Sequence, residues 1–325
     1  MAVLHPALSS PDPIRIIELS RDLPQVADLI ELCFPLHLDP DGMSYVNEMR
    51  KAARDMRLIG WLANLSDLDP GRVSGFVWEE GGEIIGNLSL IPLQKDGRRV
   101  HLIANVAVHP DHRRRGIARK LTQRALTHLG HLRESGAWLQ VRDDNPAAIA
   151  LYQSLGFVEQ AARTTWRIRP KDVKPTVISQ NTAVIVRRRK PRDCANQEHW
   201  LAETYPANIR WNLPVNFRRF TPGVLQATVN FFENVALKHW GVIANGACQG
   251  VITWQKTDSF ANNLWLAFSD TMENEILSLG LEVVLKRLVK NHPLSLDYPA
   301  GQCVEIFEDL GFVKFRTLIW MWRRL

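Results

Sequence analysis

The feature that most constrains the fold of this chain is an internal repeat with a spacing of 155 residues. The triplet Gly156-Phe157-Val158 recurs as Gly311-Phe312-Val313. The same spacing aligns three apolar pairs upstream of the triplets: Leu139 with Leu294, Val141 with Leu296, and Leu155 with Leu310. The chain has 325 residues, whereas a typical domain has about 100 to 200. Two copies of one fold are therefore the simplest prediction.

Strand-like and helix-like segments alternate in the first half. A hairpin signal at Gly81-Gly82 precedes β-rich residues 102–108, and apolar residues at helical spacing follow over 116–132. A strand pattern at 138–141 and a helix at 146–155 complete the series, with Gly156 at the position where a helix end favours glycine. This alternation predicts an α/β fold with a mixed sheet.

The second half repeats the pattern in weaker form, and residues 242–254 have the same hairpin character as 77–90. We expect a disordered N-terminus at 1–13, a first domain at 14–172 and a second domain at 176–325.

The polar residues of the first half are missing from the second. At the same spacing Tyr152 becomes Phe307 and Asn145 becomes Ala300, and the arginine run 113–115 has no counterpart. The second copy thus keeps the apolar core residues and lacks the polar residues that could take part in binding or catalysis. We expect it to be degenerate and to complete an acceptor cleft or a domain interface.

The composition is that of an ordinary globular protein, with 46% hydrophobic and 23% charged residues, which excludes a disordered or collagen-like chain. The net charge is +6, from 23 basic and 21 acidic residues over 1–175 and 17 and 13 over 176–325. Neither half is a polycation, so the excess fits an anionic small molecule as well as a nucleic acid.

The four cysteines form no CxxC pair, which is typical of reduced thiols in the cytosol. The N-terminus lacks the apolar core of a signal peptide, and no stretch reaches the roughly 18 apolar residues of a membrane span. A soluble, cytoplasmic protein with no membrane partner is expected.

The strongest chemical signal lies at 105–119, where a strand pattern runs into the basic loop His112-Arg113-Arg114-Arg115 and then a helix. A helix N-terminus carries unpaired N–H groups and partial positive charge, and Gly116 lets a ligand approach the backbone. A basic run alone is more often a solvated face. Here it follows a strand directly, at the sheet edge where α/β folds place ligands.

These residues resemble the GCN5-related N-acetyltransferase (GNAT) superfamily. Arg113-x-x-Gly116-x-Ala118 is similar to the acetyl-CoA signature (Q/R)xxGx(G/A), and residues 145–157 resemble the segment N-x(6)-Y-x-x-x-GF. Together with Val106-Ala107-Val108, the matching residues span 103–157. The resemblance implies a tandem GNAT fold with acetyl-CoA as co-substrate and an amine, of a small molecule or a peptide, as acceptor.

The resemblance also implies a role for each matching residue. The backbone of Val106, Ala107 and Val108 would pair with the pantetheine arm and polarise the thioester carbonyl. Asn145 would hydrogen-bond the cofactor arm, and Tyr152 would protonate the departing thiolate. The pyrophosphate would be held by Arg113, Arg114, Arg115, Gly116, Ile117, Ala118 and Arg119.

Structural roles stand beside two of these assignments. Asn145 before Pro146 is also an ordinary helix N-cap, and Tyr152 has apolar neighbours at helical spacing. In many members of the ribosomal-protein type a glutamate base lies five residues before the asparagine; here that residue is Gln140, which cannot accept a proton. The candidates for a base are Glu79, Glu80, His101 and a water chain.

Other functions receive less support from the sequence. His101, His109 and His112 are not on one helix face, so no metal site is expected. The run 187–190 is interpreted as a solvated strand end, and no nucleic-acid partner is expected. A protein that binds acyl-CoA without turnover remains the alternative, and a nucleic-acid-associated module is a third hypothesis.

Overall fold

The computed structural model describes residues 12–34, 40–62, 75–95, 97–176, 183–210, 213, 215–222, 235–288 and 292–325; the side chains of 55–62 are not described. The chain forms two compact units. Unit 1 comprises residues 1–140, 147–158 and 321–325, and unit 2 comprises 141–146 and 159–320. Residues 1–11 of the expected disordered N-terminus lie outside the described part of the chain.

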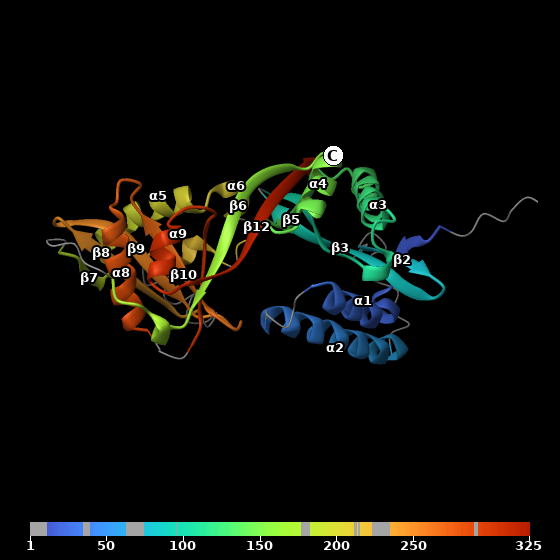
Figure 1. Cartoon of the computed structure of the whole chain (residues 1–325), viewed down its shortest axis with the longest axis horizontal. Helices are drawn as coiled ribbons and strands as arrows, with labels where there is room; N and C mark the ends of the chain where they lie inside the picture. The colour runs from blue at the N-terminus through green and yellow to red at the C-terminus, as the bar shows by residue number, and fades with distance from the viewer. Residues whose placement is uncertain are drawn as a thin grey trace, which may run out of the picture. The chain divides into compact units, whose positions relative to one another are not determined.

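Unit 1 has a twisted sheet in the hydrogen-bonded order β1-β2-β3-β4-β5, followed by the end of β12 (Figure 1). β4 is antiparallel to β3 and parallel to β5. Its elements are β1 (Ile14–Ile16), α1 (Leu19–Cys33), α2 (Pro40–Leu62), β2 (Gly75–Glu80), β3 (Glu83–Lys95), β4 (Arg98–Val108), the 3-10 turn η2 (Pro110–His112), α3 (Ile117–His131), β5 (Gly136–Arg142) and α4 (Pro146–Ser154).

Unit 2 has the strand order β12-β6-β11-β10-β9-β8-β7, and β10 is parallel to β11. Its strands are β6 (Val158–Ile168), β7 (Ile185–Arg188), β8 (Leu237–Ala244), β9 (Ala247–Gln255), β10 (Asn262–Phe268), β11 (Leu294–Pro299) and β12 (Val313–Arg324). Its helices are η3 (Pro170–Asp172), η4 (Pro191–Asp193), α5 (Cys194–Thr204), α6 (Ala207–Arg210), η5 (Phe217–Phe220), α8 (Asn274–Lys286) and α9 (Val304–Asp309).

The predicted repeat is confirmed element by element. The series β2-β3-β4-α3-β5-α4-β6 of the first half recurs as β8-β9-β10-α8-β11-α9-β12. The paired glycines, Gly156 and Gly311, both follow the second helix of this order, α4 or α9, and have φ of +81° and +96°. Only glycine adopts such a backbone without strain, which explains why this residue persists in both copies.

Each unit has an apolar core of its own between its helices and its sheet. In unit 1, Val26 and Ile30 of α1 and Val46 of α2 pack against Val77 of β2. In unit 2, α8 contributes Leu277, Leu281 and Val284 to a larger cluster, in which Phe307 packs at 5.5 Å from Trp166, ring centre to ring centre. Phe307 is the counterpart of Tyr152, so the second copy uses this position for packing.

The compact units differ from the predicted division at 172 and 176. Residues 159–172 cluster with unit 2, where β6 pairs with β11, and residues 321–325 cluster with unit 1. In unit 1, the Trp322 ring lies 5.1 Å from Trp138 of β5, and Arg323 Nη1 donates to the Leu155 carbonyl. The limits 14–172 and 176–325 stay a prediction of where the two sequence copies end.

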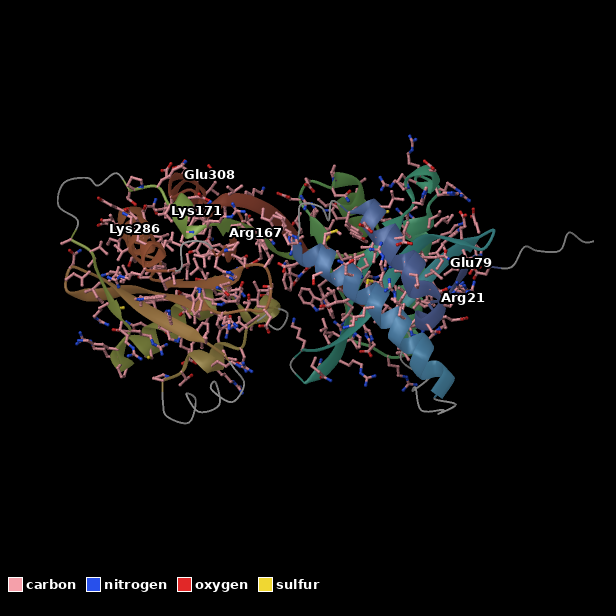
Figure 2. The ribbon with its side chains drawn as sticks, turned by 90° about the horizontal axis from the view of Figure 1, so that it is seen from below. Arg21, Glu79, Arg167, Lys171, Lys286 and Glu308 are labelled. Atoms are coloured by element: carbon pink, nitrogen blue, oxygen red, sulfur yellow. The ribbon has the colours of Figure 1, made fainter. Side chains whose placement is uncertain are left out.

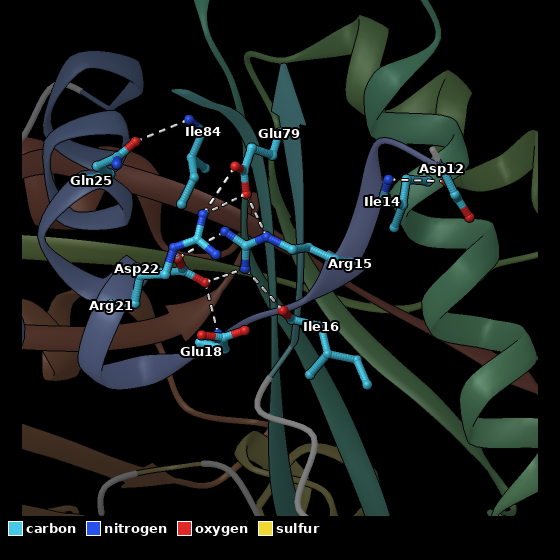
Figure 3. Close-up of polar contacts among 10 residues, drawn as sticks. All are labelled: Asp12, Ile14, Arg15, Ile16, Glu18, Arg21, Asp22, Gln25, Glu79 and Ile84. Atoms are coloured by element: carbon cyan, nitrogen blue, oxygen red, sulfur yellow. Dashed lines mark hydrogen bonds and ion pairs between the residues drawn. The ribbon is translucent and has the colours of Figure 1, made fainter. Parts of the chain in front are cut away.

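A buried ion pair fixes the start of each copy. In unit 1, Arg15 of β1 donates to both carboxylate oxygens of Asp22 in α1, at 2.5 and 2.8 Å (Figure 3). In unit 2, Arg187 of β7 donates to both oxygens of Asp193, at 2.6 and 3.0 Å. In both, the carboxylate also accepts a backbone N–H at 2.7 Å, from Glu18 or Lys190. The same strand-to-helix clamp therefore occurs twice.

The clamp of unit 1 makes its stability sensitive to acid. Burial alone would raise the pKa of Asp22, but the hydrogen bonds from Arg15 and the Glu18 amide outweigh it and hold the pKa below its ordinary value. A carboxyl with a lowered pKa stabilises the fold above its unfolded pKa of about 3.9 and loses this contribution as the pH falls. We expect Asp22→Asn to lower the free energy of unfolding at pH 7 by about 1.5 to 3 kcal/mol.

Urea denaturation at pH 7 and at pH 3 checks this prediction, because the difference between wild type and variant should shrink at the lower pH. An equal difference at both values would mean that the Asp22 charge contributes nothing.

Candidate functional site

A β-bulge marks the middle of the candidate site. Asn87 of β3 faces Ala107 of β4, and Ser89 faces Ala104, so two residues of β4 lie opposite one residue of β3. Asn105 is one of the two and has φ of +52°, and its carbonyl accepts a hydrogen bond of 2.9 Å from Asn87 Nδ2. A bulge bends its strand and redirects the residues that follow, here Val106–Val108.

The pairing of β4 with β5 ends before the bulge, and both strands continue without pairing to each other, β5 as far as Arg142. β4 pairs with β5 from His101 opposite Ala137 to Ile103 opposite Leu139, whereas β4 continues to Val108. Ala107 is buried, and Val106 and Val108 are half-buried. A strand segment that is unpaired on one side can hydrogen-bond an extended ligand there, as an added strand. The three residues expected to hold the pantetheine arm thus lie on a suitable segment.

The loop after β4 presents backbone N–H groups at a helix start. Arg114 and Gly116 both have left-handed backbone, with φ of +63° and +78°, and α3 begins directly afterwards at Ile117. A Cβ atom placed on Gly116 would meet no atom within 4 Å. The space beside this glycine is therefore open, and it lies at the N-terminus of a 15-residue helix, where an anionic group is favoured.

The arginines of the loop differ in their partners. Arg113 Nε donates to the Val108 carbonyl at 3.2 Å, and Arg115 pairs with Glu80 at 2.7 Å. Arg119 Nη2 donates to Ser154 Oγ on α4 at 2.7 Å. Arg114 is exposed and makes no side-chain contact with the described residues. All four arginines lie between residues 113 and 119, so this stretch of the chain carries a high local density of positive charge.

Two further residues of the motif serve mainly through their backbone. Ile117 is 2% exposed and packs its side chain into the core, beside Gly86 of β3. Ala118 is half-buried and accepts a hydrogen bond from Thr122 Oγ1. Only main-chain atoms of Ile117 can therefore face a ligand. The signature agrees with this, because it specifies small residues at the positions on either side, here Gly116 and Ala118.

Tyr152 lies on α4 and is buried, with its ring 5.9 Å from that of Phe157. Burial raises the pKa of the Tyr152 hydroxyl to about 12, so the group stays protonated at neutral pH. Asn145 directly precedes α4 and groups with unit 2, and its backbone N–H donates to the Arg142 carbonyl. The structure thus places Tyr152 in unit 1 and leaves the predicted cofactor contact of Asn145 untested.

The three side chains named as possible bases are poorly suited to that role. Glu79 is held by Arg15 and Arg21, and Glu80 by Arg115 and the Trp78 indole; these contacts lower the pKa of both carboxyls. Figure 2 labels Arg21 and Glu79 in the first of these clusters. His101 is buried, which lowers its pKa, and its Nδ1 lies 3.7 Å from Glu134.

Sequence reasoning missed one polar contact beside the bulge. Asn105 Nδ2 donates to the hydroxyl of Tyr45 on α2 at 2.9 Å and approaches Ser89 Oγ at 3.3 Å. This contact ties α2 to the strand that carries the predicted cofactor site. The only signal in the sequence was an asparagine inside a β-branched strand, which is compatible with left-handed backbone.

The described residues contain no group of three or more His, Cys, Asp or Glu side chains arranged to hold a metal ion. The rings of His109 and His112 lie 5.5 Å apart, and His112 contacts Arg115. Within the same part of the chain, every helix is too short or too polar to cross a lipid bilayer.

A comparison with protein families agrees with this geometry. The model of the Acetyltransferase (GNAT) family matches residues 23–157, which include the bulged strand, the glycine loop and Tyr152. Residues 23–157 therefore form a GNAT domain. This confirms the resemblance drawn from residues 103–157 and extends it towards the start of α1.

Curated relatives of this GNAT protein act on different acceptors. It is 38% identical over 82 residues to [Ribosomal protein bS18]-alanine N-acetyltransferase of Escherichia coli K12, which is 25% of this chain and 51% of the relative. It is 35% identical over 98 residues to mycothiol acetyltransferase of Kocuria rhizophila, 30% of this chain and 29% of the relative. The chain thus spans at most about half the length of these relatives.

A solved structure shares the fold over nearly the whole length. A GCN5-related N-acetyltransferase from Sphaerobacter thermophilus superposes with a TM-score of 0.55 over 96% of this chain and 95% of its own, at 16% identity. This likeness concerns the fold alone. Together with the repeated element order, it supports the predicted mixed α/β GNAT fold in two copies.

Proposed function

We propose that this protein is an N-acetyltransferase that transfers the acetyl group of acetyl-CoA directly to an amine, and that unit 1 carries the reaction. The observation that supports this most is the junction of β4 and α3. There a bulged strand leads into a loop whose last residue, Gly116, has left-handed backbone and open space at its Cβ position, at the start of a long helix. The diphosphate of acetyl-CoA fits such a junction.

The residues of unit 1 supply two of the three functions that the reaction needs. As an amine attacks the thioester, negative charge develops on the carbonyl oxygen, and a fixed N–H donor from 106–108 would stabilise it by about 3 to 4 kcal/mol. The protonated hydroxyl of Tyr152 would donate to the departing sulfur, an effect worth about 10² to 10⁴ in rate. The proton on the attacking amine would leave through water.

The acceptor is proposed only as a class, a primary amine of a small molecule or a peptide. The relatives' names include an alanine of ribosomal protein bS18 and mycothiol, so both a protein and a small molecule occur among the names of the relatives of this chain. The contact of Asn105 with Tyr45 places α2 beside the bulge and supports α2 as part of the acceptor side.

Calorimetric titration with acetyl-CoA tests the proposal. We expect one site per chain, because the connection between β10 and α8 lacks the arginine run and the glycine of unit 1. Gly116→Glu should weaken binding at least about tenfold, because it puts a side chain and a negative charge at the helix start.

Gly97→Glu is the matched control, since Gly97 also has positive φ and open space around its Cβ position but lies in the hairpin turn before β4. Its affinity for acetyl-CoA should equal that of the wild type. A second site that survives Gly116→Glu would show that unit 2 also binds acetyl-CoA, and no binding would contradict the proposal.

A second function, binding of acyl-CoA without turnover, is favoured by the surroundings of the possible bases. Gln140 occupies the position of the family's glutamate, and Glu79 and Glu80 are held in ion pairs. Release of free thiol from acetyl-CoA in a screen of amines distinguishes the two functions. A single acceptor that accelerates release above hydrolysis identifies an enzyme.

A further inference from the structure

A basic cavity lies in unit 2, outside the site proposed for acetyl-CoA. Its volume is about 640 Å³, within the range of about 300 to 1,000 Å³ that small-molecule sites occupy. It lies between the end of β7, the start of α5, the segment after η5 and the start of β8. Its basic lining residues are Arg188, Arg189, Lys190, Arg219, Lys238 and His239.

The charges of this cavity are not neutralised from within. No carboxylate is among its described lining residues, which besides the basic ones are prolines, Cys194, Thr221, Trp240 and two aliphatic side chains. Within the described part of the chain, Arg188, Lys190 and Lys238 form no ion pair. The neighbouring Asp193 already pairs with Arg187, in the clamp that unit 2 shares with unit 1.

Arg189 is the central residue of the cavity. It is half-buried and donates to two neutral acceptors, Gln197 Oε1 at 2.5 Å and the Phe220 carbonyl at 2.6 Å. No described carboxylate pairs with it. A partly buried guanidinium without a counter-charge costs free energy, and an anion bound in the cavity would offset that cost.

A buried polar network holds Arg189 and His239 in place behind the cavity. Gln197 Nε2 donates to Thr253 Oγ1 at 3.0 Å, and the same hydroxyl lies 2.8 Å from His239 Nδ1. Gln197 and Thr253 are 2% and 0% exposed. Because Thr253 Oγ1 accepts from Gln197, we assign its own O–H as the donor to His239 Nδ1. The hydrogen of the imidazole ring is then on Nε2, which can donate a hydrogen bond. The network thus presents fixed donors at the cavity.

We propose that this cavity binds a small molecule carrying a diphosphate or a similarly close pair of anionic groups. Four Lys and Arg side chains without a described ion pair, Arg188, Arg189, Lys190 and Lys238, surround one hollow. Arg189 offers a positioned guanidinium, which suits the paired oxygens of a phosphate. The half-buried Trp240 gives one wall an aromatic surface. An organic diphosphate with a planar group therefore fits better than inorganic phosphate, and the volume of the cavity favours a small molecule over a nucleic acid.

The strand-to-helix clamp of unit 1 has an additional acidic partner. There Arg15 and Arg21 share Glu79 of β2, in addition to Asp22 (Figure 3). Strand register places Ile243 of β8 at the position of Glu79, because Arg15 faces Val77 and Arg187 faces Gly241. The clamp of unit 2 therefore lacks this acidic partner, although Ile243 is not among the described residues that line the cavity. Within the cavity, Arg188 faces Trp240 and takes the place of Ile16, which faces Phe76 in unit 1.

Calorimetry with ADP and with inorganic pyrophosphate tests the proposal, in a Gly116→Glu background that weakens the proposed site of unit 1. We expect one ADP site per chain, and at least about tenfold weaker binding in the variant Arg188→Gln/Lys238→Gln, because two contacts of a charged ligand are lost. The matched control, Arg192→Gln/Lys256→Gln, removes the same charge from exposed residues of unit 2 outside the cavity, and should bind ADP like the background.

Citrate and a 12-nucleotide single-stranded RNA complete the experiment. Binding of ADP that exceeds that of pyrophosphate and citrate supports an organic diphosphate. The proposal is overturned if neither ADP nor pyrophosphate binds, if the control loses as much affinity as the cavity variant, or if RNA binds more tightly than ADP with a steep salt dependence. The test does not depend on acetyltransferase activity, so its failure leaves the proposed function intact.

Discussion

Tyr152→Phe should slow release of free thiol from acetyl-CoA, in the presence of an accepted amine, by about 10² to 10⁴. The variant keeps the ring that packs 5.9 Å from Phe157 and removes only the hydroxyl. Because burial raises the pKa of this hydroxyl to about 12, it is protonated and able to donate across the neutral range. The loss should therefore be seen in kcat, while the affinity for acetyl-CoA stays the same.

The measurement is steady-state thiol release, paired with calorimetric affinity and the thermal midpoint. Tyr45→Phe is a useful comparison, because it removes a hydroxyl that contacts Asn105 at the proposed acceptor side. It should change KM for the amine more than kcat. Equal rates for wild type and Tyr152→Phe would remove Tyr152 from the mechanism and leave it a packing residue.

Arg163→Met should destabilise unit 2 by about 3 kcal/mol, because it removes one partner of a buried ion pair. Arg163 is 3% exposed, and its Nε donates to Asp297 Oδ1 at 2.5 Å. It also donates to the Thr204 carbonyl at 2.7 Å and lies over the Tyr205 ring, 4.7 Å from its centre. Methionine fills similar volume but leaves the carboxylate and the carbonyl without a donor.

Urea denaturation followed by tryptophan fluorescence measures the loss, and two further variants separate its causes. Arg163→Met/Asp297→Asn should recover part of the stability, because the unpaired charge is gone. Arg50→Met removes a half-buried arginine that pairs with the exposed Asp28 and Glu31 and should cost less than about 1 kcal/mol. A loss of this size in Arg163→Met would show that the buried pair contributes little.

The comparison of sequence with structure is clearest at Gly116 and Tyr152. Both were predicted from local patterns, since a left-handed residue at a helix start favours glycine, and a motif of fixed spacing fixes the helix on which the tyrosine lies. The bulge at Asn105 was not predicted, because a bulge depends on the register of two strands, β3 and β4, whose pairing a single strand's sequence does not specify.

The sequence did not predict the partners of the charged residues either. Glu80 with Arg115 and Arg119 with Ser154 are both 35 residues apart in the chain, and Arg163 with Asp297 are 134 apart. Whether an arginine is free for a phosphate or already engaged depends on such pairs. The basic cavity of unit 2 was interpreted from sequence as a solvated strand end, because residues 188–190 meet 237–240 only in the paired strands.

The sequence by itself determined the two-copy α/β fold, the position of the predicted acetyl-CoA loop and the loss of polar residues from the second copy, because each depends on local periodicity or on the spacing of a few residues. The tertiary structure alone decided which chain segments complete each unit. It places β6 beside β11 and the last five residues in unit 1. Strand pairing joins residues that are far apart in the chain, and the alternation of apolar residues in a strand indicates a buried face without naming the neighbour.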